Sequence, residues 1–146
     1  MIRSMLAVPA VRPEFFAKAA AGSTDSLFID VEDSVFDDMK VKARDIAAEA
    51  IEKIDWGDKL VLVRCNGLDT EWAFRDIEKI GCSCPKLDGF LVPKIESVDE
   101  IRFVENLFQH IDRERPADRP LELHILIETA KGVAHVEDII ERSERL

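Results

Sequence analysis

Charged side chains follow the apolar segments of this chain at the points where those segments end. Glu128 comes directly after the largely apolar run 121–127, and Arg64 comes directly after the run 60–63. Lys94 comes shortly after a fourth apolar run. Such runs are typical of strands buried on both faces of a parallel sheet. Because α/β enzymes place their chemistry at the edge where parallel strands end, the pattern predicts a site there.

The second strand end carries three carboxylates within four residues, Asp30, Glu32 and Asp33. Carboxylates this close repel one another unless a cation or an arginine lies nearby, so a structural and a functional role both stay open for them. Packing explains Glu128 poorly, and a hard oxygen ligand of this kind suits Mg²⁺. The planar guanidinium of Arg64 can take a carboxylate through two parallel hydrogen bonds. For Arg64 and Glu128 we therefore favour function over structure.

Other polar residues near the strand ends have a simpler interpretation. Ser97 and Glu100 form a capping-box pattern in front of an apolar helical stripe. We assign these two residues, and Glu96 beside them, to the start of a helix and not to chemistry.

Composition limits the class of protein. With 146 residues, 47% of them hydrophobic and 34% charged, the chain is expected to form one soluble globular domain. A net charge of −10 argues against nucleic acid or an anionic membrane as the main partner. No apolar run approaches the roughly 20 residues that span a bilayer, and no signal peptide is present, so we expect a cytoplasmic protein. The spacing of Cys65, Cys82 and Cys84 fits no zinc site, and reduced thiols are expected.

The apolar pattern predicts strands that alternate with helices. The predicted strands are 2–8, 27–29, 60–63, 90–92 and 121–127. The predicted helices are 14–21, 38–54, 72–80, 98–111 and a last one that begins near Val133, with Gly22 and Gly81 as helix ends and with Phe15 and Val41 on buried faces.

Two architectures fit this order, an open doubly wound sheet or part of a TIM (β/α)₈ barrel. A complete barrel takes about 250 residues, and five β/α units in 146 residues keep the same spacing. On the barrel interpretation, residues 1–146 are a single partial domain, truncated to about the first five units.

Five segments also resemble one known family in their order along the chain. They are Arg3–Pro9 with Arg12–Glu14, Ile29–Val35 with its D-x-E-D turn, Val63–Thr70 with its R-x-N segment, Val92–Ser97, and Ile127–Gly132. Together they resemble the HpcH/HpaI aldolase group, which includes the citrate lyase β-subunit and malyl-CoA lyase.

The resemblance implies a TIM barrel that binds Mg²⁺, with Mn²⁺ as the alternative metal. It implies a carbon–carbon lyase that cleaves or forms a CoA thioester such as citryl-CoA or malyl-CoA by a retro-Claisen reaction. Glu128 matches the metal-ligand position, and Arg64 matches the catalytic residue that grips the carboxylate of the keto-acid or hydroxy-acid part. Glu32 and Asp33 match neighbours that hold Arg64 and metal-bound waters, and Lys94 is a further substrate-binding candidate.

In one respect the chain departs from the family pattern. The family's second metal ligand is an aspartate on the strand after the glutamate, and this chain ends before that strand would begin. We therefore expect little or no lyase activity from the 146 residues alone. The exposed sheet edge leads us to expect a homo-oligomer, and an acyl-carrier subunit is a further partner of this family type. Two alternatives stay open: a metal-dependent aldolase that releases pyruvate, and a non-catalytic relative that only binds a ligand or partner.

Overall fold

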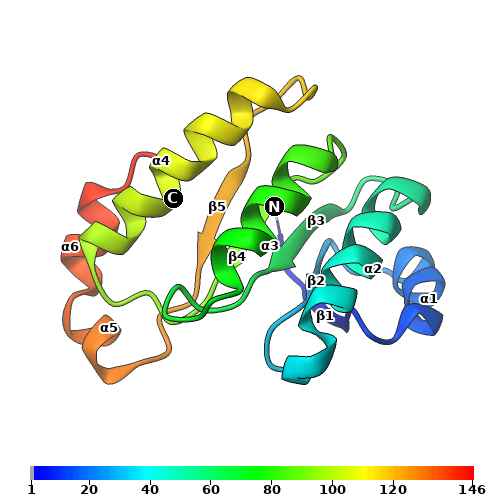
Figure 1. The fold of residues 1–146 in the computed structure, drawn as a ribbon, viewed down its shortest axis with the longest axis horizontal. Coiled ribbons are helices and arrows are strands. Elements are labelled where there is room, and N and C mark those ends of the chain that lie inside the picture. Colours follow the sequence, from blue (N-terminus) through cyan, green and yellow to red (C-terminus); the bar gives the residue numbers. More distant parts are fainter. Residues whose placement is uncertain (1) are drawn as a thin grey trace.

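The computed structural model describes residues 2–146 and contains a single five-stranded parallel sheet. The strands lie in chain order, β1-β2-β3-β4-β5, and each pairs in parallel with the next (Figure 1). Their bounds are β1 (Met5–Pro9), β2 (Ser26–Asp30), β3 (Leu60–Arg64), β4 (Gly89–Val92) and β5 (Glu122–Ile125). Both the alternation of strand and helix and the parallel pairing predicted from the sequence are confirmed.

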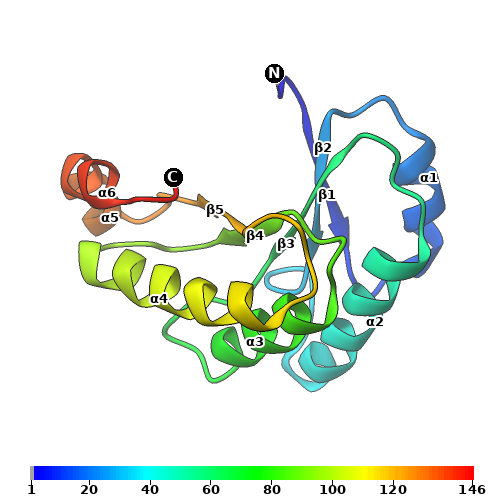
Figure 2. The ribbon, with the colours of Figure 1, turned by 90° about the horizontal axis from the view of Figure 1, so that it is seen from above.

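Helices connect the strands and cover one side of the sheet. The helices are α1 (Phe16–Ala21), α2 (Lys40–Lys53), α3 (Ala73–Ser83), α4 (Val98–Glu114), α5 (Ala130–Ala134) and α6 (Val136–Arg142), with 3₁₀ turns at Pro13–Phe15 and Asp37–Met39. Figure 2 shows α1 to α4 as an outer arc around the curved sheet. This arrangement, with helices outside and strands inside, is that of one side of a (β/α) barrel. Within residues 2–146 no helix has the length and apolar character needed to cross a membrane.

The core lies between the sheet and this arc of helices. Ile29, Val63 and Phe90 point from neighbouring strands toward the helices and are fully buried. Phe90 packs on Phe108 of α4, with the two ring centroids 5.7 Å apart. Strands β2, β3 and β4 are buried at most of their positions, as the continuous apolar runs predicted, and the helices bury every third or fourth residue against them.

The strand register decides which side chains meet at the carboxyl edge of the sheet. Asp30 at the end of β2 lies opposite Arg64 at the end of β3, and Arg64 lies opposite Leu91 of β4. These positions alternate with the helix-facing core residues, so they point to the inner side of the sheet. The guanidinium of Arg64 accordingly lies over the ring of Phe28, 5.4 Å from its centroid.

Strand β5 differs from the strand expected to be buried on both faces. Glu122 is exposed, and His124 to Ile127 are only half-buried. The reason is that β5 is an edge strand whose inner face is open: a cavity of about 610 Å³ lies there, lined in part by Phe28 and Leu126. At the opposite edge Met5 is 41% exposed, as expected for a sheet that is not closed within these residues.

Several helix predictions need correction. Gly81 does not end α3, which continues to Ser83. A Cβ at Gly81 would lie 3.0 Å from Cγ2 of Ile111, so this glycine serves close packing of α3 on α4. The last predicted helix is two helices, because the backbone departs from helical geometry at His135, whose Nδ1 lies 3.0 Å from the Glu96 carbonyl.

Two apolar residues were assigned to the wrong helix face. Phe15 is 42% exposed and Val41 is 59% exposed, whereas Phe16 and Ala47 are buried as expected. Both residues lie near the start of a helix, where the boundary is uncertain by one or two residues. The apolar pattern therefore predicts poorly which side chains are buried there. The capping box is confirmed: Ser97 Oγ accepts the Glu100 N–H at 3.4 Å, and Glu100 Oε2 accepts the Ser97 N–H at 2.9 Å.

Candidate functional site

The centre of the site is a two-pronged ion pair between Asp30 and Arg64. Arg64 Nε donates to Asp30 Oδ1 at 2.9 Å, and Arg64 Nη2 donates to Asp30 Oδ2 at 2.8 Å. The register places these two residues side by side at the ends of β2 and β3. One edge of the guanidinium is therefore filled by the protein itself, and the edge that carries Nη1 faces the other two carboxylates. The Nη1 atom lies 3.4 Å from Glu32 Oε2 and 3.5 Å from Asp33 Oδ2.

The turn after β2 holds Asp30 in its ionised form. Its Oδ1 accepts the Glu32 N–H at 2.9 Å, and its Oδ2 accepts the Ser34 N–H at 3.2 Å. Burial alone would raise the pKa of Asp30, but the hydrogen bonds from Arg64, Ser34 and Glu32 outweigh burial and hold that pKa below its usual value. The hydrogen bond to Asp30 in turn raises the pKa of Arg64, so both partners stay charged.

Glu32 lies next to this pair and is 4% exposed. Its Oε1 accepts a hydrogen bond from Lys94 Nζ at 2.7 Å, and this bond raises the pKa of Lys94. Its Oε2 is buried and has no hydrogen-bond partner in residues 2–146. A buried carboxylate oxygen without a donor is costly in a folded protein, so a ligand or an ordered water is expected to supply one.

Lys94 connects this cluster to Glu128. Its backbone has a φ of 56°, a left-handed conformation that is uncommon for a lysine. In this conformation the Lys94 N–H donates to Glu128 Oε1 at 3.2 Å, while the Lys94 side chain reaches Glu32. Backbone pairing continues past the strand ends, because the Leu126 N–H donates to the Val92 carbonyl at 2.9 Å. The segment that carries Glu128 is thus fixed beside the one that carries Lys94.

A second, deeper layer of polar groups supports the turn at Glu32. Lys40 is 5% exposed, and its Nζ donates to the carbonyl of Glu32 at 2.7 Å and to the carbonyl of Val31 at 3.3 Å. Asn66 Nδ2 also donates to the Val31 carbonyl, at 3.1 Å. These two side chains come from α2 and from the segment after β3, so both neighbouring units fix the backbone of the acidic turn.

Asn66 is itself held by a buried ion pair. Asp76 Oδ2 accepts both the Asn66 N–H at 3.0 Å and Asn66 Nδ2 at 2.6 Å. Asp76 Oδ1 accepts Arg44 Nε at 2.8 Å, with side-chain exposures of 8% for Arg44 and 0% for Asp76. This pair links α2 to α3 directly behind the site.

The residues present are compatible with a hard divalent cation. Glu128 is exposed, with one carboxylate oxygen on a backbone N–H, and the unpartnered Oε2 of Glu32 lies on the same edge of the sheet. Mg²⁺ commonly uses one or two protein carboxylates and completes its shell with water and substrate oxygens. Residues 2–146 contain no group of three or more His, Cys, Asp or Glu side chains arranged to hold a metal. Within these residues, the edge therefore does not supply a complete set of metal ligands from the protein alone.

The structure brings most of the predicted site residues together. Arg64, Glu32, Asp33 and Lys94 form one connected cluster of ion pairs. Glu128 joins that cluster through the backbone of Lys94, and no contact joins it to Arg64 among the interactions of residues 2–146. The roles given to these five residues stay predictions.

Four residues were missed as parts of the site. Asp30 was one of the noted carboxylates, but its role as the direct partner of Arg64 was not predicted. Lys40, Asn66 and Asp76 were not predicted either. Of Lys40, Asn66 and Asp76, only Asn66 belongs to a segment noted in the sequence, as the third residue of the R-x-N segment.

The chain belongs to the HpcH/HpaI aldolase/citrate lyase family, whose model matches residues 3–146. It is 39% identical over 145 residues to an L-malyl-CoA/β-methylmalyl-CoA lyase of Cereibacter sphaeroides, covering 99% of this chain and 46% of that protein. A malyl-CoA/β-methylmalyl-CoA/citramalyl-CoA lyase of Chloroflexus aurantiacus is 32% identical over 127 residues, covering 86% of this chain and 36% of that protein. The chain spans about half the length, or less, of these curated relatives.

Solved structures agree with the barrel interpretation. The citrate lyase β-subunit of Mycobacterium tuberculosis, complexed with oxaloacetate and magnesium, superposes with a TM-score of 0.70 at 28% identity, covering 92% of this chain and 51% of that one. RipC from Yersinia pestis superposes with a TM-score of 0.72 at 28% identity, covering all of this chain and 55% of that one. The five β/α units thus have the fold of about half of a citrate lyase-type TIM barrel, which confirms the fold class predicted from the sequence.

Proposed function

We propose that this chain carries the substrate-gripping part of the active site of a Mg²⁺-dependent lyase that cleaves or forms a 3-hydroxyacyl-CoA thioester. The observation that carries the proposal is the Asp30–Arg64–Glu32–Lys94 cluster at the carboxyl edge of a sheet whose family includes malyl-CoA lyases. Two cations held among carboxylates, beside an exposed glutamate, suit a substrate that is anionic and binds together with a metal.

In this proposal each residue has a distinct task. Asp30 holds one edge of the guanidinium. Arg64 Nη1 forms ion pairs with Glu32 and Asp33 at 3.4 and 3.5 Å but no hydrogen bond with either, and in this proposal it turns to the substrate carboxylate. Glu32 keeps Lys94 in place, and its Oε2, which is in an ion pair with Arg64 but accepts no hydrogen bond, is presented to a water or a substrate hydroxyl. Lys94 contributes a second positive charge on the same edge. The positions of these charges, and not any covalent step on the protein, then fix the substrate's orientation.

Glu128 would hold the Mg²⁺, with Glu32 beside it to orient metal-bound water. The chemistry that Mg²⁺ supplies in such a site is polarisation of the substrate's keto or hydroxyl oxygen. The M. tuberculosis relative, which is complexed with oxaloacetate and magnesium, supports a keto acid and a metal as the ligands of this proposal.

We expect Glu128→Gln to weaken Mg²⁺ binding by about tenfold or more, because it removes a charge-assisted oxygen ligand. Isothermal titration of the 146-residue chain with MgCl₂, in the presence and absence of oxaloacetate, measures this effect. Glu137→Gln is the matched control, since Glu137 is an exposed glutamate on α6, away from the cluster. Equal Mg²⁺ affinity in the wild type and Glu128→Gln would remove Glu128 from the metal site.

A second activity is favoured by one relative. A (3S)-malyl-CoA thioesterase of Cereibacter sphaeroides is 31% identical over 137 residues of this chain. The products separate the two reactions: retro-Claisen cleavage of malyl-CoA releases glyoxylate and acetyl-CoA, whereas hydrolysis releases malate and free CoA. We expect mass spectrometry of an incubation with malyl-CoA and Mg²⁺ to find acetyl-CoA, at a rate well below that of a full-length lyase. Free CoA with malate would instead assign the chain to the thioesterase reaction.

A further inference from the structure

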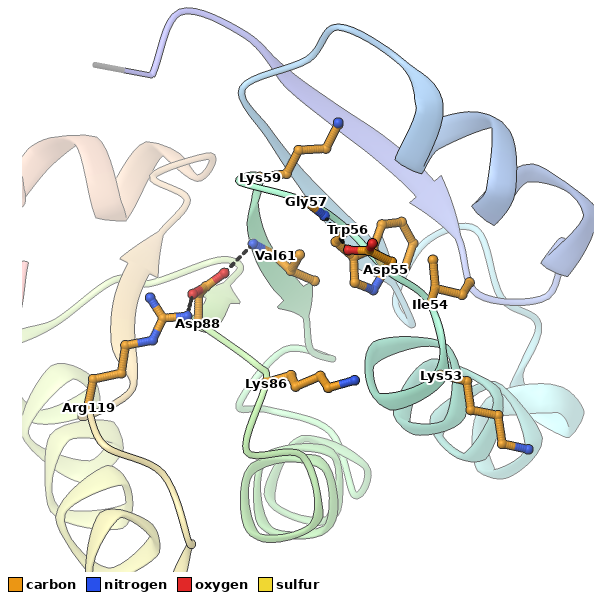
Figure 3. Close-up of a pocket in the computed structure, with 10 residues that line it drawn as sticks. All are labelled: Lys53, Ile54, Asp55, Trp56, Gly57, Lys59, Val61, Lys86, Asp88 and Arg119. Atoms are coloured by element: carbon orange, nitrogen blue, oxygen red, sulfur yellow. Dashed lines mark hydrogen bonds and ion pairs between the residues drawn. The ribbon is translucent and has the colours of Figure 1, made fainter.

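A cavity of about 410 Å³ lies at the end of the sheet opposite to the candidate site (Figure 3). Its walls come from the segments that precede three strands: the loop between α2 and β3, the loop between α3 and β4, and the loop between α4 and β5. Small-molecule sites typically enclose about 300–1,000 Å³. None of the residues proposed for the lyase chemistry lines this cavity, so it is a separate feature of the chain.

Trp56 brings an unused hydrogen-bond donor to this cavity. The residue is 6% exposed and packs edge-on against Phe16, with ring centroids 6.3 Å apart. Its Nε1 is buried and has no partner in residues 2–146. In Figure 3 this nitrogen lies on the edge of the indole nearest Lys86 in that view. An unpaired buried donor is unfavourable, and an acceptor on a bound ligand would satisfy it.

The cavity is also positively charged, although the whole chain has a net charge of −10. Four of its lining side chains are cationic and two are anionic. Lys86 Nζ donates to the carbonyl of Glu52 at 2.5 Å, which leaves two of its three N–H donors free. Among the interactions of residues 2–146 Lys86 forms no ion pair, so its charge is not neutralised. Arg119 pairs with Asp88, whose other oxygen accepts the Val61 N–H at 2.5 Å.

The other two cations contribute less directly. In Figure 3 the side chains of Lys53 and Lys59 extend away from the middle of the cavity, and Lys53 is paired with Glu49 at 2.6 Å. They raise the local potential without facing a ligand. The donors on the Lys86 side of the cavity are therefore the Trp56 indole and the Lys86 ammonium, whereas Arg119 lies beyond Asp88, to which it is paired.

We propose that this cavity binds the phosphate group of a small phosphorylated metabolite. The Trp56 indole and the Lys86 ammonium come from two separate loops, and Arg119 adds a positive charge from a third. A tetrahedral phosphate presents oxygens in several directions, whereas a planar carboxylate presents two. Lysine and arginine are the usual cationic partners of phosphate. The apolar side chains of Ile54 and Val61, which also line the cavity, are available to the organic part of the ligand.

The test follows the indole N–H signals in ¹H–¹⁵N spectra of the full 146-residue chain. The chain has two tryptophans, and Trp56→Phe assigns the signals; if that variant does not fold, Trp72→Phe assigns them by elimination. Titration with inorganic phosphate, and separately with phenyl phosphate, is made at constant ionic strength. We expect a saturable movement of the Trp56 signal and none of the Trp72 signal. Tighter binding of phenyl phosphate identifies a phosphorylated metabolite, and equal binding identifies free phosphate.

Two variants separate specific binding from general charge attraction. Lys86→Met should weaken binding by about tenfold or more, because it removes a charge-assisted hydrogen bond. Lys53→Met removes the same charge from a side chain that points away, and should change the affinity by less than about twofold. The proposal is overturned if the Trp56 signal does not saturate, if acetate binds as tightly as phosphate, or if the two lysine variants weaken binding equally.

Discussion

Asp76→Ala is expected to lower the free energy of unfolding by about 3–5 kcal/mol, the range seen when one partner of a buried ion pair is removed. The substitution leaves the Arg44 guanidinium buried without its carboxylate and leaves the Asn66 N–H without its acceptor, while Asn66 Nδ2 keeps only the Val31 carbonyl. Urea unfolding followed by circular dichroism measures the change. In a domain of this size the loss is a large part of the total stability.

Asp45→Ala is the matched control for this prediction. Asp45 pairs with Lys79, again between α2 and α3, but the two side chains are 54% and 51% exposed. An exposed ion pair contributes at most about 1 kcal/mol, so Asp45→Ala should change the free energy of unfolding by no more than that amount. Similar losses in Asp76→Ala and Asp45→Ala would show that the buried network does not stabilise the fold. In the double variant Arg44→Met with Asp76→Leu, part of the stability should return, since no buried charge is then left unpaired.

Arg64→Met should cost about 3–5 kcal/mol near neutral pH and should reverse the pH dependence contributed by Asp30. In the wild type the pKa of Asp30 is below its unfolded value of 3.8. Its contribution to stability is therefore fully present above pH 3.8 and is lost as the pH falls through the lower folded-state pKa. Without Arg64, burial is opposed only by the hydrogen bonds from Ser34 and Glu32. We expect the pKa of Asp30 in the variant to rise above 3.8, so that the variant loses stability as the pH rises through that range.

The measurement is the free energy of unfolding of wild type and Arg64→Met at several pH values between about 4 and 7. The difference between the two proteins should grow with pH across this interval. Arg12→Met is the control, because Arg12 forms an exposed pair with Glu14 at 2.5 Å. A difference that is constant with pH would mean that Arg64 does not keep Asp30 ionised.

The order of elements could be predicted from the sequence because each strand and helix buries one face of its own residues. The ends of β2 and β3 were also predictable, since Asp30 and Arg64 each follow an apolar run directly. Local patterns could not show which neighbour Arg64 binds, because that depends on the register between two strands 34 residues apart. They also could not show that Gly81 packs against α4, since Ile111 lies in another helix.

The supporting layer of the site was not predictable for a related reason. Lys40 binds backbone carbonyls, which every residue has, so no residue type in the sequence marks its partner. In the sequence, Asp76 has the position of an ordinary polar residue of α3. In the structure it is fully buried and accepts three hydrogen bonds from two other segments. Features of this kind depend on how three units pack together.

The parallel register of Asp30 with Arg64 has a consequence for how such proteins can vary in length. Side chains alternate between the two sides of a strand, so a single-residue insertion within β2 or β3 would turn one partner toward the helices. The same insertion in the loop 55–59, before β3, leaves the pair intact, because the strand can keep its register. Changes in chain length are therefore tolerated in the loops that connect strands and helices, and not within β2 or β3, whose register holds Asp30 against Arg64.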